Sequence, residues 1–215
     1  MPETLTPERR TSLIADLATM YSIDPKVVEG VLQVESAGKA FGIGGCMIVR
    51  FEVHHFVGWW KQPIEVWSKL FRFGANGHYP WTEQYWRTTE SEPWRKLHVP
   101  QAWWAMQLEE HSALTFARSL DDEAALKSIS MGAPQVLGRN CVKAGWPSAR
   151  SMFDVWSISE TAQIVGFFNF ILGDGLLPLL RSEDWPRFAT GYNGAGNAEA
   201  YAARLRDTVQ KLRGG

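Results

Sequence analysis

The segment "VLQVESAG", residues 31–38, ends a predicted helix with a carboxyl group among apolar side chains. Asp24 and Pro25 mark where this helix begins, because an aspartate cap followed by proline in the first turn is typical of helix N-termini. Gly38 marks its end, since glycine commonly takes the left-handed conformation that closes a helix. The segment is therefore predicted to be the last part of an amphipathic helix that begins near residue 25.

Glu35 is predicted to lie inside the apolar stripe of this helix. With successive residues about 100° apart, Glu35 falls about 40° from Val31, in a stripe that also contains Val27, Val28 and Val34. Burial and the helix dipole both favour the protonated carboxyl at this position. A carboxyl group that stays neutral near pH 7 can act as a general acid. The alternative is a structural role, in which the buried glutamate is paired with an arginine or bonded to backbone groups. The helix pattern taken by itself favours this alternative over a catalytic role.

A second carboxyl group, Glu52, lies in "MIVRFEVH", residues 47–54, where the sequence changes to an alternating period. The alternation predicts a short strand with Arg50, Glu52 and His54 on its polar face. Glu52 is then either half of a surface ion pair or the catalytic partner of Glu35, because glycosidases usually use a pair of carboxyl groups.

No metal or cofactor site is predicted. His54 and His55 are adjacent, and adjacent residues on a strand point to opposite faces of the sheet. The sequence has no CxxC or HExxH spacing. Cys46 and Cys141 are expected to be unpaired, as is usual for two lone cysteines in a cytoplasmic protein.

The segment "GYNGAGN", residues 191–197, follows another predicted helix. Its glycines and its Asn-Gly pair are typical of a helix end followed by a turn. The alternative is a loop in which Tyr192 and Asn193 face a cleft while the glycines let a ligand approach the backbone.

The rest of the chain predicts a mainly α fold with one small extended element near residues 47–54. Caps and helical spacing recur along the chain, with no internal repeat, low-complexity tract or linker, so residues 1–215 are expected to form a single domain. One other helix is predicted to begin at Thr6 and Pro7, and three more are predicted over 59–70, 81–90 and 102–119. A short helix is predicted from Asp121 or Asp122 to Lys127. The last three predicted helices follow the capping box 157–160, Asp184 and Asn197. The segment 73–80 is rich in turn residues.

The overall composition argues against several classes of function. The net charge is −1 and no basic patch is visible, so no nucleic-acid partner is expected. No uncharged apolar run approaches the ~18–20 residues that span a bilayer, so no membrane insertion is expected. The N-terminal "MPETLTPERR" lacks the apolar core of a secretory signal. The chain is therefore expected to be made in the cytoplasm and to stay there unless another factor releases it.

Tryptophan is unusually abundant. Eight of the eleven tryptophans fall between Trp59 and Trp104. Most are expected in the core, and a few are expected to line a groove, because indole rings stack well on flat, partly apolar ligands such as sugar rings.

Three segments occur in an order that resembles the goose-type lysozyme and lytic transglycosylase superfamily: "VESAG" with Glu35, "SMGAPQVLG" with Gln135, and "GYNGAG" with Tyr192 and Asn193. The closer resemblance is to the N-acetylmuramidase domain of phage endolysins. It extends through "FEVHHF", "DDEAALKSISMGAPQVLG" and "DWPRFATGYNGAG", from about residue 12 onward. The family often has Ser-Trp-Gly where this chain has Ser-Met-Gly at 130–132, so one wall of the cleft is expected to differ.

The resemblance implies a lysozyme-like α+β fold and a muramidase that cleaves the β-1,4 bond between N-acetylmuramic acid and N-acetylglucosamine. Glu35 would be the catalytic acid that protonates the glycosidic oxygen. Glu52, in the family's Phe-Glu motif, would be the second catalytic carboxylate. Gln135, Tyr192 and Asn193 would bind and position the sugar.

The resemblance also implies peptidoglycan glycan strands as the partner, and the chain is expected to be a monomer. The separate peptidoglycan-binding module that some relatives carry is expected to be absent, because the chain leaves no room for one. It would reach the periplasm through a holin if it is a phage endolysin, or through a delivery machine if it is a secreted antibacterial effector. A lytic transglycosylase acting on the same bond and a non-catalytic glycan-binding protein are the other functions that the sequence leaves open.

Overall fold

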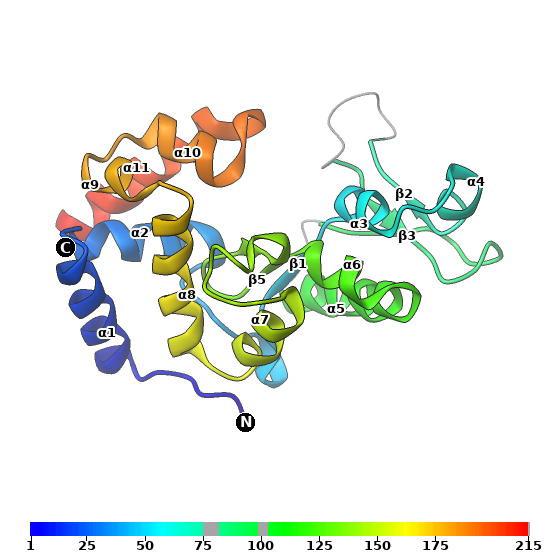
Figure 1. The fold of residues 1–215 in the computed structure, drawn as a ribbon, viewed down its shortest axis with the longest axis horizontal. Helices are drawn as coiled ribbons and strands as arrows, with labels where there is room; N and C mark the ends of the chain where they lie inside the picture. The colour runs from blue at the N-terminus through cyan, green and yellow to red at the C-terminus, as the bar shows by residue number, and fades with distance from the viewer. Residues whose placement is uncertain (75–81, 99–102, 215) are drawn as a thin grey trace.

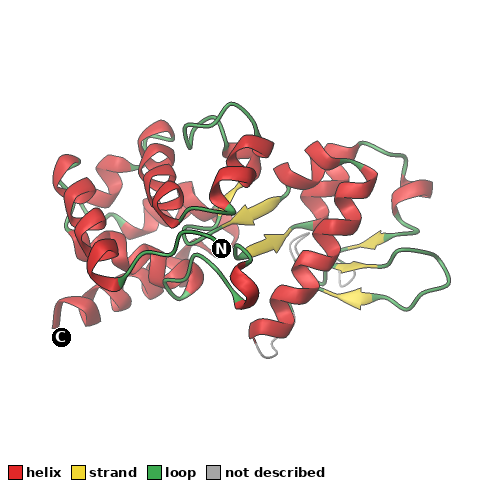
Figure 2. Cartoon of the chain, turned by 90° about the horizontal axis from the view of Figure 1, so that it is seen from below, coloured by secondary structure: helices red, strands yellow, loops and turns green. Residues whose placement is uncertain are grey.

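The computed structural model describes residues 1–74, 82–98 and 103–214. Helices make up most of the chain, and the strands form two small antiparallel sheets (Figure 2). The predicted mainly α fold with a small extended element is thus confirmed. The helices are α1 (Pro7–Met20), α2 (Pro25–Ser36), α3 (Val53–Trp60), α4 (Ile64–Trp67), α5 (Trp103–Leu120), α6 (Asp122–Lys127), α7 (Ala149–Trp156), α8 (Glu160–Gly173), α9 (Leu177–Arg181), α10 (Trp185–Asn193) and α11 (Ala198–Gly214), with 3₁₀ turns η1 (Ile43–Gly45), η2 (Gly138–Asn140) and η3 (Ala195–Asn197). The strands are β1 (Val49–Phe51), β2 (Phe71–Arg72), β3 (Tyr85–Trp86), β4 (Arg95–Lys96), β5 (Ile129–Met131) and β6 (Val136–Leu137).

Local sequence signals determine the first two helices. Thr6 caps α1 and Asp24 caps α2, each by accepting a backbone N–H of the first turn, so both predicted starts are confirmed. The end of α2 differs slightly from the prediction. Ala37 already takes the left-handed conformation, with a φ of 53°, and Gly38 follows it with a φ of 74°.

The apolar face of α2 is buried between α1 and α11 (Figure 1). Val27, Val28 and Val31 of the predicted stripe are at most 1% exposed, as is the neighbouring Leu32, whereas Val34 is half-buried. Gly30 lets α11 come close, because a Cβ there would lie 2.5 Å from a methyl carbon of Val209. The middle of α2 therefore packs closely against α11.

A three-stranded antiparallel sheet, in the order β1-β5-β6, lies in the middle of the molecule (Figure 1). The predicted strand is confirmed over Val49–Phe51, but Glu52 is not part of it. Glu52 stands at the N-cap of α3, and His54 already belongs to that helix. The predicted strand was too long because Val53, the first residue of α3, is fully buried. It is buried like Val49 and Phe51, the alternate residues of β1, although Val53 is helical.

Helix α5 covers the outer edge of β1. The Gln107 side chain bonds both the N–H and the C=O of Val49, each at 3.0 Å. The Glu110 carboxyl accepts the N–H of Phe51 at 2.7 Å. These contacts satisfy backbone groups that would otherwise be unpaired on an edge strand, and they fix the position of β1.

The second sheet, β2-β3-β4, lies on the same side of the molecule as α3 and α4 (Figure 1). The predicted helix over 81–90 is wrong, because Tyr85 and Trp86 form β3. Trp86 pairs with Phe71 of β2 and is buried, which is the environment that aromatic strand residues favour. The turn-rich segment 73–80 lies mostly outside the described residues.

Two further expectations concern the whole chain. Within the described residues, no helix combines the length and the apolar character needed to span a bilayer. Cys46 is exposed and Cys141 is buried, and both are free thiols, as predicted.

Candidate active site

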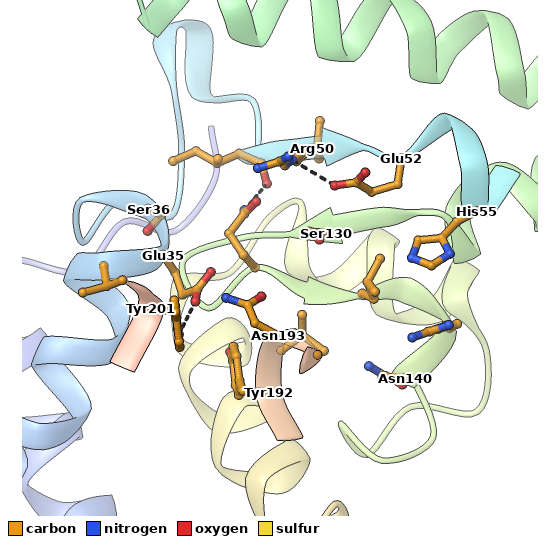
Figure 3. Close-up of a pocket in the computed structure, with 18 of the residues that line it drawn as sticks. Glu35, Ser36, Arg50, Glu52, His55, Ser130, Asn140, Tyr192, Asn193 and Tyr201 are labelled. Carbon is orange, nitrogen blue, oxygen red and sulfur yellow. Dashed lines mark hydrogen bonds and ion pairs between the residues drawn. The ribbon is translucent and has the colours of Figure 1, made fainter. Parts of the chain in front are cut away.

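A cleft of about 1070 Å³ lies between α2, α10 and α11 on one side and β1, α3 and the β5–β6 hairpin on the other. Figure 3 shows Glu35 and Tyr201 on one side of it and Glu52 and His55 on the other. The structure brings every predicted site residue to this cleft: Glu35, Glu52, Gln135, Tyr192 and Asn193 all line it. These residues come from segments far apart in the sequence.

Glu35 is half-buried at the end of α2 and opens onto the cleft. Burial raises the pKa of its carboxyl to about 7, while a hydrogen bond from Tyr201 and the charges of Arg204 and Arg50 act in the opposite direction. Removal from water is therefore the dominant effect, as the apolar stripe predicted. A large fraction of Glu35 is protonated at neutral pH and can donate a proton to a ligand in the cleft.

Tyr201 is the residue that contacts this acid directly, and the sequence did not identify it as part of the site. It lies on α11, is only 1% exposed, and its hydroxyl donates a hydrogen bond to Oε1 of Glu35. In the sequence it belongs to the apolar side of an amphipathic helix. A tyrosine hydroxyl on such a face needs a buried partner, and this requirement is the signal that could have pointed to Glu35.

Tyr192 lines the cleft and also joins two elements of the fold. It and Asn193 are the last residues of α10 and not part of the following loop. The Tyr192 hydroxyl donates to the backbone C=O of Pro134 at 2.6 Å, and its ring stacks on Phe188 at 5.2 Å. Tyr192 thus ties α10 to the β5–β6 hairpin, whereas Asn193 is exposed and borders the cleft.

Gln135 is positioned by the turn between β5 and β6. Its backbone has a φ of 49°, and its side-chain amide donates to the C=O of Gly132 at 2.8 Å and, at 3.5 Å, to that of Ile48. The side chain lines the cleft next to β1. Two backbone carbonyl groups therefore hold the amide, one just after β5 and one just before β1.

Glu52 is not the exposed strand residue that the alternation suggested. It is 9% exposed, and its carboxylate pairs with Nε of Arg50 at 2.9 Å. It also accepts a hydrogen bond from the Gln84 amide at 2.5 Å and lies 3.6 Å from Nδ1 of His54. The ion pair with Arg50 that the sequence suggested exists, but it lies in the wall of the cleft.

Gln84 links the second sheet to this site. Its side chain is fully buried, its amide nitrogen donates to Glu52, and its oxygen accepts the N–H of Val53 at the start of α3. One side chain therefore orients both the Glu52 carboxylate and the helix that follows it. Nothing in the local sequence around Gln84 indicates this contact.

The two histidines after Glu52 do not point to opposite faces. Both belong to the first turn of α3, and their rings lie 4.1 Å apart. Burial lowers the pKa of both, that of His55 to about 4, so they are neutral at pH 7. Across the described part of the chain, no group of three or more His, Cys, Asp or Glu side chains is arranged to hold a metal ion.

Glu110 is a further buried acid beside Glu52. It is 1% exposed, and burial raises the pKa of its carboxyl to about 8, with the nearby Glu52 charge adding to the effect. Its hydrogen bond to the N–H of Phe51 gives it a structural role in holding β1. No tryptophan occurs among the described residues that line the cleft. Trp81 and the side chains of Trp103 and Trp104 lie outside the described part of the chain, so the expectation that a few tryptophans line a groove stays a prediction.

The chemistry of the cleft follows from its two principal carboxyl groups. Glu35 is a neutral proton donor in an apolar setting, whereas Glu52 is a carboxylate held by a cation and an amide. Arg50 is close enough to influence the charge of both. Two carboxyl groups in such different surroundings suit acid-catalysed cleavage of a glycosidic bond.

Comparisons with known proteins agree with this chemistry. A family model described as N-acetylmuramidase matches residues 24–213. No curated protein matches the chain. Among solved structures, the chain is similar to the one titled "Crystal structure of Burkholderia AP3 phage endolysin", with a TM-score of 0.64 and 25% sequence identity. That similarity covers 94% of this chain and 69% of the other.

Proposed function

Because this chain belongs to the N-acetylmuramidase family, we propose that it hydrolyses the β-1,4 bond between N-acetylmuramic acid and N-acetylglucosamine in peptidoglycan. The family makes it a peptidoglycan glycosidase, and the choice of bond is the finer proposal. The observation that supports it most strongly is Glu35, a proton donor with a pKa of about 7 that opens onto the cleft.

In the proposed reaction, Glu35 gives its proton to the glycosidic oxygen as the bond from the muramic acid anomeric carbon to that oxygen breaks. The positive charge that develops on the sugar is stabilised by the Glu52 carboxylate, which also orients the attacking water. Water adds its oxygen to the anomeric carbon, and its released proton restores the neutral acid. Gln135, Tyr192 and Asn193 position the sugar against Glu35.

A lytic transglycosylase reaction on the same bond is the second candidate. There the C6 hydroxyl of muramic acid attacks in place of water and leaves a 1,6-anhydro end. The observation that favours it is that the Glu52 carboxylate is already engaged by Arg50 and Gln84, so an activated water has fewer free acceptor positions on it.

Product analysis in H₂¹⁸O separates these reactions. Purified sacculi are digested, and the released fragments are analysed by mass spectrometry. We expect muramic acid ends that carry one ¹⁸O atom from the solvent. Anhydro ends without ¹⁸O would overturn hydrolysis in favour of transglycosylation, and binding without any released fragment would overturn both.

The substitution Tyr201→Phe is expected to move the alkaline limit of activity to higher pH. The Tyr201 hydroxyl stabilises the charged form of Glu35, so its removal raises the pKa of Glu35 above about 7. A lost hydrogen bond of this kind corresponds to a shift of about 0.5–1 pH unit in the descending limb of kcat/KM. The measurement is the pH profile of sacculus digestion.

Tyr192→Phe is the matched comparison for this shift, because its hydroxyl bonds Pro134 and not Glu35. Its descending limb is expected at the wild-type pH, whatever its rate. A limb that moves in Tyr192→Phe and stays in place in Tyr201→Phe would reverse the assignment of the two tyrosines.

The similarity to a Burkholderia phage endolysin supports a biological proposal. We propose that the chain is a phage or prophage endolysin that acts on the cell wall as a monomer with a single catalytic domain. A holin would give it access to the periplasm. A secreted antibacterial effector with its own delivery machine is the alternative.

A further inference from the structure

The cleft contains a positive charge that the proposed reaction does not use. Arg139 lies in η2, directly after β6, and lines the cleft with an exposed side chain. The charges of Arg50 and Arg204 act on Glu35, whereas the charge of Arg139 acts on His54 and His55. Arg139 therefore belongs to the end of the cleft away from the acid.

His55 and Asn140 mark this end of the cleft in Figure 3, where they lie across the cleft from Glu35. Both histidines there are neutral at pH 7, because burial lowers their pKa. The next cation along the chain, Lys143, pairs with Asp174. In the part of the chain that the structure describes, no carboxylate forms an ion pair with Arg139, so its charge is not neutralised.

The backbone at Arg139 is fixed in place. A Cβ on the preceding Gly138 would lie 1.9 Å from the backbone oxygen of Leu126, so the turn packs directly onto the end of α6. The C=O of Gly138 also accepts the N–H of Cys141 at 3.1 Å. A guanidinium on a rigid turn, open to the cleft and without a partner, is arranged to bind an anion that enters with the substrate.

We propose that Arg139 binds a carboxylate of the peptide stem on muramic acid, so that this end of the cleft selects glycan strands that still bear their stems. The proposal rests on the proposed function. Peptidoglycan glycans have neutral sugar rings, and their negative charges are the free carboxylates of the peptides attached to muramic acid. A planar guanidinium pairs with a carboxylate through two parallel hydrogen bonds, and the neutral groups of His54, His55 and Asn140 can complete the site.

The test compares two forms of one substrate. Soluble uncrosslinked glycan strands with intact stems are compared with the same strands after their stem carboxylates have been converted to amides, which removes charge and leaves size almost unchanged. For the wild-type chain, amidation is expected to lower kcat/KM by about fivefold to tenfold, as the loss of one charge-assisted hydrogen bond in a solvent-accessible cleft would.

Arg139→Ala is expected to lower kcat/KM on intact stems and to remove most of the difference between the two substrates. Arg139→Lys keeps the charge and should restore part of the difference between the two substrates. Arg206→Ala is the matched control, because Arg206 is an exposed arginine on α11 that does not line the cleft. It removes one positive charge and is expected to keep the wild-type ratio.

Two results would overturn the inference while leaving the proposed function intact. One is a wild-type chain that cleaves both substrates equally well. The other is an Arg139→Ala variant that loses the same factor on both. Failure of the wild-type chain to cleave either substrate would instead contradict the proposed function itself.

Discussion

Glu35→Gln is expected to lower kcat/KM on peptidoglycan by about 10³-fold, because an amide cannot give a proton to the leaving oxygen. The effect should fall on kcat, since the glycan still contacts the remaining cleft residues. The fold should survive, because glutamine has the same shape and its oxygen can still accept the Tyr201 hydroxyl. Rates of sacculus digestion and the midpoint of thermal unfolding are measured together.

Glu29→Gln is the matched control for this substitution. Glu29 lies on the same helix, pairs with Lys26 at 3.0 Å, and does not line the cleft. It is expected to digest sacculi at the wild-type rate. A Glu35→Gln variant with more than about a tenth of wild-type activity would contradict the assignment of Glu35 as the acid, since loss of a general acid costs about 10²–10⁴-fold.

Glu52→Gln has the second largest expected effect, a loss of about 10²-fold in kcat. The proposed reaction needs a negative charge opposite Glu35 to stabilise the positive sugar and orient the water, and an amide supplies none. The alkaline limb of the pH profile should stay near 7, because Glu35 remains in place. The measurement is kcat on soluble glycan strands across this pH range.

Glu90→Gln provides the comparison, since Glu90 forms an exposed ion pair with Lys69 and does not line the cleft. It should leave kcat unchanged. If Glu52→Gln kept full activity while remaining folded, the two-carboxylate mechanism would be wrong, and the single-acid transglycosylase reaction would explain the cleft better.

The parts of this structure that the sequence predicted well depend on local chemistry. The caps at Thr6 and Asp24 act within one turn of the chain, and the buried stripe of α2 follows from helical spacing alone. The same spacing predicted the burial of Glu35 and hence the direction of its pKa shift. Each of these features needs only neighbouring residues.

The parts that failed depend on contacts between distant segments. Strands of two or three residues, such as β3 at Tyr85, are too short for a period to distinguish them from a helical turn. Glu52 lies in the cleft wall because Gln84 and Arg50 converge on it, and no local pattern encodes that contact. Tyr201 contacts Glu35 because α11 packs against α2. No local sequence pattern indicates that these two helices pack together.

The ordered motifs identified more of the site residues than the helical and strand periodicity did. They named Gln135, Tyr192 and Asn193, which the structure brings to one cleft with Glu35. They did not distinguish the tyrosine that contacts the acid from the one that braces the β5–β6 hairpin, because both lie on helices beside the same site.

The central claim is that burial keeps a proton on Glu35 at neutral pH. The most direct measurement is the titration of the Glu35 carboxyl by carbon NMR on protein labelled at the glutamate side chains, with Glu35→Gln used to assign the signal. The predicted result is a carboxyl that titrates with a pKa of about 7 and is missing from the variant. A Glu35 signal that titrates near the ordinary value of about 4.3 would contradict the claim.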